Sequence, residues 1–149
     1  MDTKSILLVE DNPDDEALTL RALDKSGVNG NVVVVRDGAE ALDYLFCRGP
    51  YAGRDVSQTP VMVLLDLKLP KLGGIEVLKE MRRDDRMRCI PVVVLTSSRE
   101  QQDIQNSYSS GANSYVRKPV DFVEFTEAVK QLGTYWLRIS EPPPRVRSA

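Results

Sequence analysis

The sequence predicts an α/β protein built on one doubly wound, parallel β-sheet. Five apolar runs alternate along the chain with five segments of helical periodicity. The first four runs are rich in Val and Leu without polar alternation, which is typical of parallel strands that helices cover on both faces. Repeated strand-then-helix units with right-handed crossovers assemble one open sheet. Strands are therefore expected at residues 5–10, 32–36, 61–66, 91–97 and 114–119.

Local signals between these runs mark the expected helices. Asn12 offers a capping side chain, and Pro13 suits the first position of a helix. Asp37 followed by Glu40 is typical of a capping box with Asp as the cap. The glycines that occur where helices should end are Gly27, Gly49 and Gly111. Helices are therefore expected at residues 13–27, 38–49, 74–85, 99–111 and 121–139.

Composition limits the classes of structure and function. The 149 residues, 42% of them hydrophobic and 28% charged, suit one globular domain, expected over residues 1–140. The Pro-rich segment 141–149 is expected to be a disordered tail. A formal net charge of −2 does not favour nucleic acid, and no apolar stretch approaches the length of a membrane span. Because a signal-peptide pattern is also absent, the expected location is the cytoplasm.

The chain contains no histidine, which excludes a Ser-His-Asp triad, a histidine metal site and a role as phosphohistidine donor. Cys47 and Cys89 lack the spacing of a metal cluster and are interpreted as reduced, buried or half-buried thiols. Residues 47–60 form an unusually long connection before the third strand. The sequence leaves open whether this segment is a tolerated surface insertion or a loop that faces a partner.

Polar residues gather at the carboxyl ends of the expected strands. They are Glu10, Asp11, Asp66, Thr96 and Lys118. In a parallel sheet these ends share one edge, where α/β folds bind ligands. Carboxylates that lie close together resist ionisation, and a hard divalent cation such as Mg²⁺ relieves their repulsion. Such a site suits phosphoryl transfer to Asp66, because the metal and Lys118 would neutralise charge on the phosphoryl oxygens.

Four stretches, in this order, resemble the receiver domain of bacterial two-component response regulators. They are "VEDNPDDE", "LLDLKLPKLGG", "VVVLTSS" and "SYVRKP", and the likeness covers roughly residues 5–132. The resemblance implies a flavodoxin-like (CheY-like) fold with five helices and five strands in the order 2-1-3-4-5. It also implies that a phosphohistidine on a sensor histidine kinase donates the phosphoryl group. The long loop before the third strand and a chain that stops soon after the fifth helix are similar to stand-alone regulators paired with phytochrome-type histidine kinases.

The resemblance assigns phosphoacceptor and metal roles to individual residues. Asp66 matches the phosphoacceptor, which also binds the metal, and Asp11 matches the carboxylate that binds Mg²⁺ directly. Glu10 matches the second acid, which acts through water. Lys68 matches the position whose backbone carbonyl completes the metal site, although the family often has a neutral or smaller residue there.

The resemblance also assigns residues that respond to phosphorylation. Lys118 matches the phosphate-binding lysine, and Thr96 matches the hydroxyl that swings toward the phosphoryl group. Tyr115 matches the aromatic switch that moves inward when Thr96 moves. The surface expected to change is formed by the fourth helix, the fifth strand and the fifth helix, through a shift between two existing states.

An apolar stripe runs through the last expected helix and beyond the expected edge of the domain. Its members, at spacings of three and four residues, are Phe122, Phe125, Val129, Leu132, Trp136 and Ile139. The first half is interpreted as the face that covers the sheet. Because the stripe continues through "YWLRI", we expect a homodimer through Phe125, Leu132, Trp136 and Ile139.

Three other functions are less favoured. A small phosphatase with an aspartyl-phosphate intermediate would show a second aspartate two residues after its nucleophile, where this chain has Lys68. A flavin carrier on the same fold would have a loop rich in Ser, Thr and Gly after the first strand, where this chain has "EDNPDDE". A receiver-like scaffold that is never phosphorylated is kept as the alternative function. The chain is thus expected to be a signalling domain that catalyses only its own phosphorylation and dephosphorylation.

Overall fold

The structure is a computed structural model that describes residues 4–25 and 31–144. It contains a five-stranded sheet in the order β2-β1-β3-β4-β5, and every neighbouring pair of strands is parallel. The strands are β1 (Ser5–Val9), β2 (Asn31–Val35), β3 (Met62–Leu65), β4 (Val92–Thr96) and β5 (Ser114–Arg117). The predicted flavodoxin-like order and parallel pairing are therefore confirmed.

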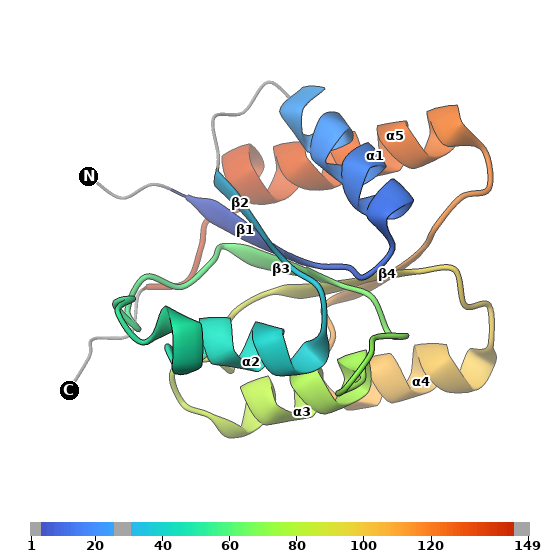
Figure 1. The fold of residues 1–149 in the computed structure, drawn as a ribbon. Helices are drawn as coiled ribbons and strands as arrows, with labels where there is room; N and C mark the ends of the chain where they lie inside the picture. Colours follow the sequence, from blue (N-terminus) through green and yellow to red (C-terminus); the bar gives the residue numbers. More distant parts are fainter. Residues whose placement is uncertain (1–3, 26–30, 145–149) are drawn as a thin grey trace.

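Helices cover both faces of this sheet (Figure 1). The helices are α1 (Pro13–Lys25), α2 (Gly38–Leu45), α3 (Gly74–Arg83), α4 (Gln101–Ser109) and α5 (Phe122–Thr134). Helices α1 and α5 pack together on one face, and α2, α3 and α4 lie on the other. Each of the helices α1 to α4 returns the chain to the amino end of the next strand, so the carboxyl ends of all strands lie at one edge.

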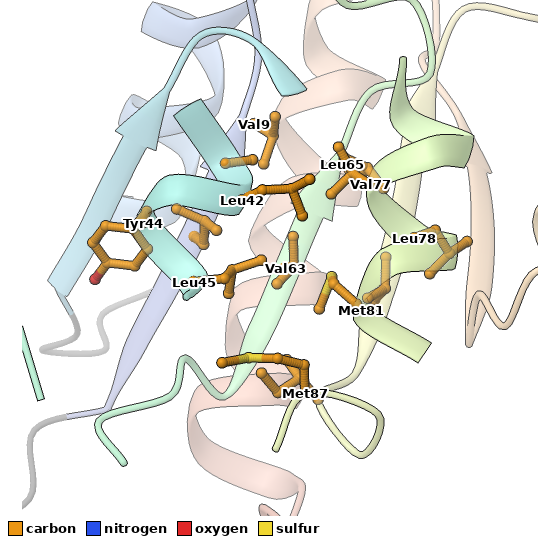
Figure 2. Close-up of a cluster of buried hydrophobic side chains, with 14 of the residues drawn as sticks. Val9, Leu42, Tyr44, Leu45, Val63, Leu65, Val77, Leu78, Met81 and Met87 are labelled. Carbon is orange, nitrogen blue, oxygen red and sulfur yellow. The ribbon is translucent and has the colours of Figure 1, made fainter. Parts of the chain in front are cut away.

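The central strands are buried on both faces, which explains their continuous apolar sequence. Leu7 of β1 and Val63 of β3 belong to the core cluster shared with α2 and α3. Ile6 and Leu64, their neighbours along the strands, belong to the cluster shared with α1 and α5. Figure 2 shows the first cluster, in which side chains of α2 and α3 close over β1 and β3. Close packing on both sides holds the strand ends in fixed positions.

The first turns of α1 and α2 are capped by the expected side chains. Asn12 Oδ1 accepts hydrogen bonds from the backbone N–H groups of Asp14 at 2.9 Å and Asp15 at 3.1 Å. Asp37 Oδ1 accepts from the backbone N–H of Glu40 at 2.7 Å. These bonds satisfy backbone donors that have no partner inside the helix.

Helix α2 is shorter than expected, and the long connection after it packs back onto the helix. The chain turns away at Cys47, whose φ is 57°, and forms the short helix η1 (Gly49–Tyr51). Within this connection, Tyr51 Oη donates to Glu40 Oε2 at 2.7 Å, and the Arg54 guanidinium lies 3.7 Å from the ring centroid of Tyr44. Gly27, the expected end of the first helix, lies outside the described residues.

The last helix departs from the expected periodicity at its end. Helix α5 continues as η2 (Tyr135–Ile139), a π-helical turn. A π turn contains one more residue than an α turn, so it shifts the position that faces the core. Leu137 is therefore 4% exposed, whereas Ile139, the expected member of the stripe, is 66% exposed.

Two phenylalanines of the expected stripe also lie differently. Phe125 is 4% exposed and packs in the core cluster shared with α1, so the prediction that it lines a dimer interface is wrong. Its position is one turn into α5, where the helix already lies against α1. Phe122, at the start of the helix, is 51% exposed, so the interpretation that it helps to cover the sheet is wrong, whereas it holds for Phe125 and Val129. Leu132 and Trp136 are partly buried against the same cluster, which leaves only part of each side chain at the surface.

The end of the described chain passes close to the amino edge of the sheet. Residues 141–144 form no helix or strand and line a hollow together with Lys4 and residues 59–61. Residues 145–149, the rest of the predicted tail, lie outside the described residues. Both cysteines are free thiols; Cys47 is half-buried as predicted, whereas Cys89 is exposed, so the prediction of a buried or half-buried thiol is wrong there. Among residues 4–25 and 31–144, none of the helices has the length and apolar character needed to cross a bilayer.

Candidate functional site

The predicted site residues project from the carboxyl edge of the sheet. Glu10 follows β1, Asp66 follows β3, Thr96 ends β4 and Lys118 follows β5. Backbone hydrogen bonds extend the strand ladders to these positions, from Asp66 N to Val9 O at 3.2 Å and from Lys118 N to Thr96 O at 2.7 Å. The functional side chains are thus held directly at the strand ends by these backbone bonds, which fixes their mutual geometry.

The turn after Asp66 holds α3 against the site. Gly74 N donates to Leu67 O at 3.0 Å. A Cβ atom at Gly74 would lie 2.3 Å from Asp66 O, closer than any side chain allows. Glycine at this position therefore lets the first turn of α3 approach the backbone of the predicted phosphoacceptor.

Lys118 is the central cation of the site. Its Nζ donates to Glu10 Oε1 at 2.7 Å, to Asp15 Oδ2 at 2.8 Å and to Asp66 Oδ2 at 2.9 Å. An ammonium group has three N–H donors, so all of them are used. The Lys118 side chain is 8% exposed, which removes most competing water from these bonds.

Burial and charge act in opposite directions on this cluster. Burial raises the pKa of Glu10 to about 7, although the ammonium of Lys118 lowers it. Burial also lowers the pKa of Lys118, but the carboxylates of Asp15, Glu10 and Asp66 raise it more, so it stays above its usual value. At neutral pH the metal-free site therefore holds a charged amine beside a partly protonated Glu10.

Three carboxylates beside the amine could hold a divalent cation. One oxygen from each of Glu10, Asp11 and Asp66 lies within 4.8 Å of the others. This all-oxygen set suits Mg²⁺, and the exposed Asp11 and half-buried Asp66 leave room for the waters that this ion retains. Lys68 borders the same pocket, since its backbone N lies 3.4 Å from Asp66 Oδ1.

The two predicted switch residues lie on either side of the loop between β4 and α4. Thr96 is 1% exposed at the end of β4. Tyr115 Oη donates to the backbone carbonyl of Ser98 at 3.0 Å, and Ser98 Oγ donates to Asp103 Oδ2 at 2.5 Å. Tyr115 therefore links β5 to the segment that follows Thr96 and leads into α4.

Sequence reasoning missed Asp15 and Ser98. The sequence feature that could have pointed to Asp15 is its place in the acid-rich start of a helix that follows a strand. Such a helix begins at the carboxyl edge of the sheet, where the other site residues lie. The sequence could not separate Asp15 from Asp14, since the choice depends on the rotation of α1 about its axis. Ser98, two residues beyond Thr96, carried no signal other than its nearness to the strand end.

The chain matches known proteins over most of its length. Residues 6–130 match the family model described as the response regulator receiver domain. The probable methanogenesis regulatory protein FilR2 of Methanothrix harundinacea is 44% identical over 138 residues, which span 93% of this chain and 86% of the relative. The response regulator Rcp1 of Synechocystis sp. is 37% identical over 134 residues, which span 90% of this chain and 89% of the relative.

Solved structures agree with the sequence matches. A crystal structure of the phosphorylated cyanobacterial phytochrome response regulator RcpA gives a TM-score of 0.88 at 42% identity, over 95% of this chain and 99% of that chain. The Mn²⁺-bound form of Rcp1 gives a TM-score of 0.87 at 35% identity, over 94% of this chain and 99% of that chain. With its sheet order and its acidic edge, this chain therefore belongs to the response regulator receiver domain family.

Proposed function

We propose that this chain is a single-domain response regulator in which Asp66 accepts a phosphoryl group from a sensor histidine kinase. The observation that carries the proposal is the position of Asp66 between two places for positive charge. Its Oδ2 accepts from Lys118 Nζ at 2.9 Å, and its carboxylate also belongs to the cluster with Glu10 and Asp11. A phosphoryl group on Asp66 would therefore lie next to an ammonium group and a metal ion, as phosphoryl transfer requires.

The proposed reaction needs no histidine in this chain. An oxygen of the Asp66 carboxylate attacks phosphorus in line with the P–N bond of a phosphohistidine. The new P–O bond forms as the P–N bond breaks, and the electron pair passes to the imidazole nitrogen, which is then protonated. A general base is not required, because a carboxylate nucleophile carries no proton to remove at neutral pH.

The proposed cofactor is Mg²⁺. Asp11 and Asp66 would bind it directly, Glu10 through water and Lys68 through its backbone carbonyl. When bound, the ion supplies charge neutralisation for the phosphoryl oxygens. The oxygen-only donor set supports this assignment, and the Mn²⁺-bound form of the relative Rcp1 supports a divalent cation in this chain.

Phosphorylation is proposed to alter the surface formed by α4, β5 and α5. The Thr96 hydroxyl would donate to a phosphoryl oxygen, and Tyr115 would move inward as Thr96 moves. The 3.0 Å hydrogen bond from Tyr115 Oη to the Ser98 carbonyl supports the proposal, because it couples Tyr115 to the loop that leads from Thr96 into α4. The change would shift the populations of two existing conformations.

A phytochrome-type histidine kinase is the proposed donor, acting with this chain in the cytoplasm. The support comes from RcpA, a cyanobacterial phytochrome response regulator of similar fold and sequence. Phosphotransfer from a purified phytochrome-type kinase should be faster than transfer from an unrelated sensor kinase at equal concentration. Equal rates from both kinases would contradict this choice of donor.

The proposed oligomer is a homodimer through the end of α5 and η2. Ile139 and Tyr135 are 66% and 47% exposed, and they line a hollow together with Glu127 and Lys130. An acid and a base one helical turn apart can each meet the opposite charge across a two-fold axis. Sedimentation velocity should therefore show a dimer for the wild-type protein and a monomer for Ile139→Asp, while a monomeric wild type would contradict the proposal.

Intact-protein mass spectrometry tests the central proposal. The protein is incubated with a small acyl phosphate, with Mg²⁺ or with a chelator, beside Asp66→Asn. One phosphoryl increment is expected in the wild type with Mg²⁺, and none with the chelator or in the variant. No increment under conditions that phosphorylate a control receiver, and none from the phytochrome-type kinase, would favour an unphosphorylated receiver-like scaffold.

A further inference from the structure

We propose that Asp15 is a positioning residue for Lys118 and thereby for phosphoryl transfer to Asp66, an inference that rests on the proposed function. Asp15 Oδ2 accepts one of the three N–H groups of Lys118 at 2.8 Å. The other two N–H groups donate to Glu10 and Asp66. Asp15 is thus a fourth acidic residue at the site, and it approaches the amine from a different element than the metal-ligand cluster does.

The start of α1 is built to present Asp15 to the amine. Asn12 Oδ1 accepts from the backbone N–H groups of Asp14 and Asp15, which fixes the first turn of the helix. The Asp15 side chain is 30% exposed and bonded to Lys118, whereas the exposed neighbour Asp14 takes none of the three hydrogen bonds of the amine. Two adjacent, chemically identical side chains therefore differ in whether they contact Lys118.

Two fixed acceptors determine where the third N–H of Lys118 points. Before transfer this N–H donates to Asp66 Oδ2, and after transfer it would donate to a phosphoryl oxygen carried by Asp66. Glu10 holds the amine from the end of β1 and Asp15 holds it from α1 in the unphosphorylated protein, and both would keep it in place after transfer. Lysine is a flexible side chain with a freely rotating ammonium group, so the loss of one acceptor allows the donor to turn away from the reacting group.

The test compares matched substitutions at the two adjacent aspartates. The initial rate of phosphoryl uptake from a small acyl phosphate is measured by intact mass over a range of Mg²⁺ concentrations. At saturating Mg²⁺, Asp15→Ala should lower the rate roughly tenfold, as loss of an orienting partner does at metal sites. Asp15→Asn keeps an oxygen acceptor and should recover most of the rate, and Asp14→Ala should match the wild type.

The Mg²⁺ dependence separates positioning from a role in metal binding. The Mg²⁺ concentration for half the maximal rate should change no more in Asp15→Ala than in Asp14→Ala, because both variants remove one nearby charge. A wild-type rate in Asp15→Ala, a failure of Asp15→Asn to recover the rate, or a selectively raised Mg²⁺ requirement would each overturn the inference. If the wild type itself takes no phosphoryl group from any donor, the proposed function fails instead.

A second measurement does not depend on the reaction. The ammonium ¹⁵N resonance of Lys118 in the unphosphorylated protein reports how fast its protons exchange with water. Asp15→Ala should speed this exchange, while Asp15→Asn and Asp14→Ala should leave it slow. Equal exchange in Asp15→Ala and in the wild type would show that Asp15 does not hold the amine.

Discussion

Replacing Glu10 with glutamine should stabilise the metal-free protein near neutral pH and above. Glu10 is 1% exposed, and burial raises its pKa from 4.5 to about 7 against the lowering effect of Lys118. Since one pKa unit corresponds to about 1.4 kcal/mol, the ionised carboxylate weakens the folded state by about 3 kcal/mol. Glutamine keeps an oxygen that can accept from Lys118 and carries no charge, so Glu10→Gln should recover about 3 kcal/mol.

The sign of the pH dependence follows from the raised pKa. The folded protein binds the Glu10 proton more tightly than the unfolded chain does, so this contribution to stability is fully present below pH 4.5. It is lost as the pH rises through the folded-state value of about 7. The difference in free energy of unfolding between Glu10→Gln and the wild type should therefore be small at about pH 5, grow up to about pH 7 and then level off.

Urea unfolding in a chelator measures this difference, with the fluorescence of Trp136, the single tryptophan, as the signal. Asp14→Asn is the matched control, because it removes an exposed charge from the nearby first turn of α1 and should show no comparable gain. Equal free energies of unfolding for Glu10→Gln and the wild type at about pH 8 would refute the reasoning. A gain that does not change with pH would refute it as well, since it would not come from ionisation of Glu10.

Four further substitutions test other parts of the structure. Arg82→Met should lower the free energy of unfolding by about 3 kcal/mol without changing phosphoryl uptake. The reason is that the Arg82 guanidinium donates to four backbone carbonyls of two loops. An unchanged urea midpoint would contradict this prediction. Leu137→Ala should cost about 3 kcal/mol and Ile139→Ala under about 0.5 kcal/mol in dilute protein, and the reverse order would contradict the π turn. Gly74→Ala should slow phosphoryl uptake by displacing Asp66, and a wild-type rate would contradict the close approach.

The residues that meet at the carboxyl edge of the sheet were predictable, because their placement depends on little more than the direction of the strands. An apolar run without alternation identifies a parallel strand, and parallel strands bring their carboxyl ends to one edge. Asp66 and Lys118 each follow such a run, so their nearness follows from topology before any side-chain packing is known. The structure puts Lys118 Nζ 2.9 Å from Asp66 Oδ2, although 52 positions separate the two residues in the chain.

The end of the last helix was not predictable in the same way. The stripe that includes Ile139 assumes that the α-helical period continues, whereas the chain forms a π turn over Tyr135–Ile139. A contact from the far end of the chain accompanies this turn, since Lys4 Nζ donates to the Leu137 carbonyl at 3.0 Å. Hydrogen bonds between such distant segments leave no periodic trace in the sequence, so Leu137 was missed.

The buried carboxylate of Glu10 shows why the functional site was easier to predict from the sequence than the ends of the helices. A carboxylate at this position weakens the metal-free fold, because burial raises its pKa to about 7. Asp11 and Asp66 add two more carboxylates within 4.8 Å, and the Lys118 amine donates to those of Glu10 and Asp66. Folding alone does not favour three carboxylates so close together, whereas a divalent cation bound by them relieves their repulsion. Residues that oppose stability therefore identify the site, while residues that merely adjust packing, such as Leu137, are visible only in the structure.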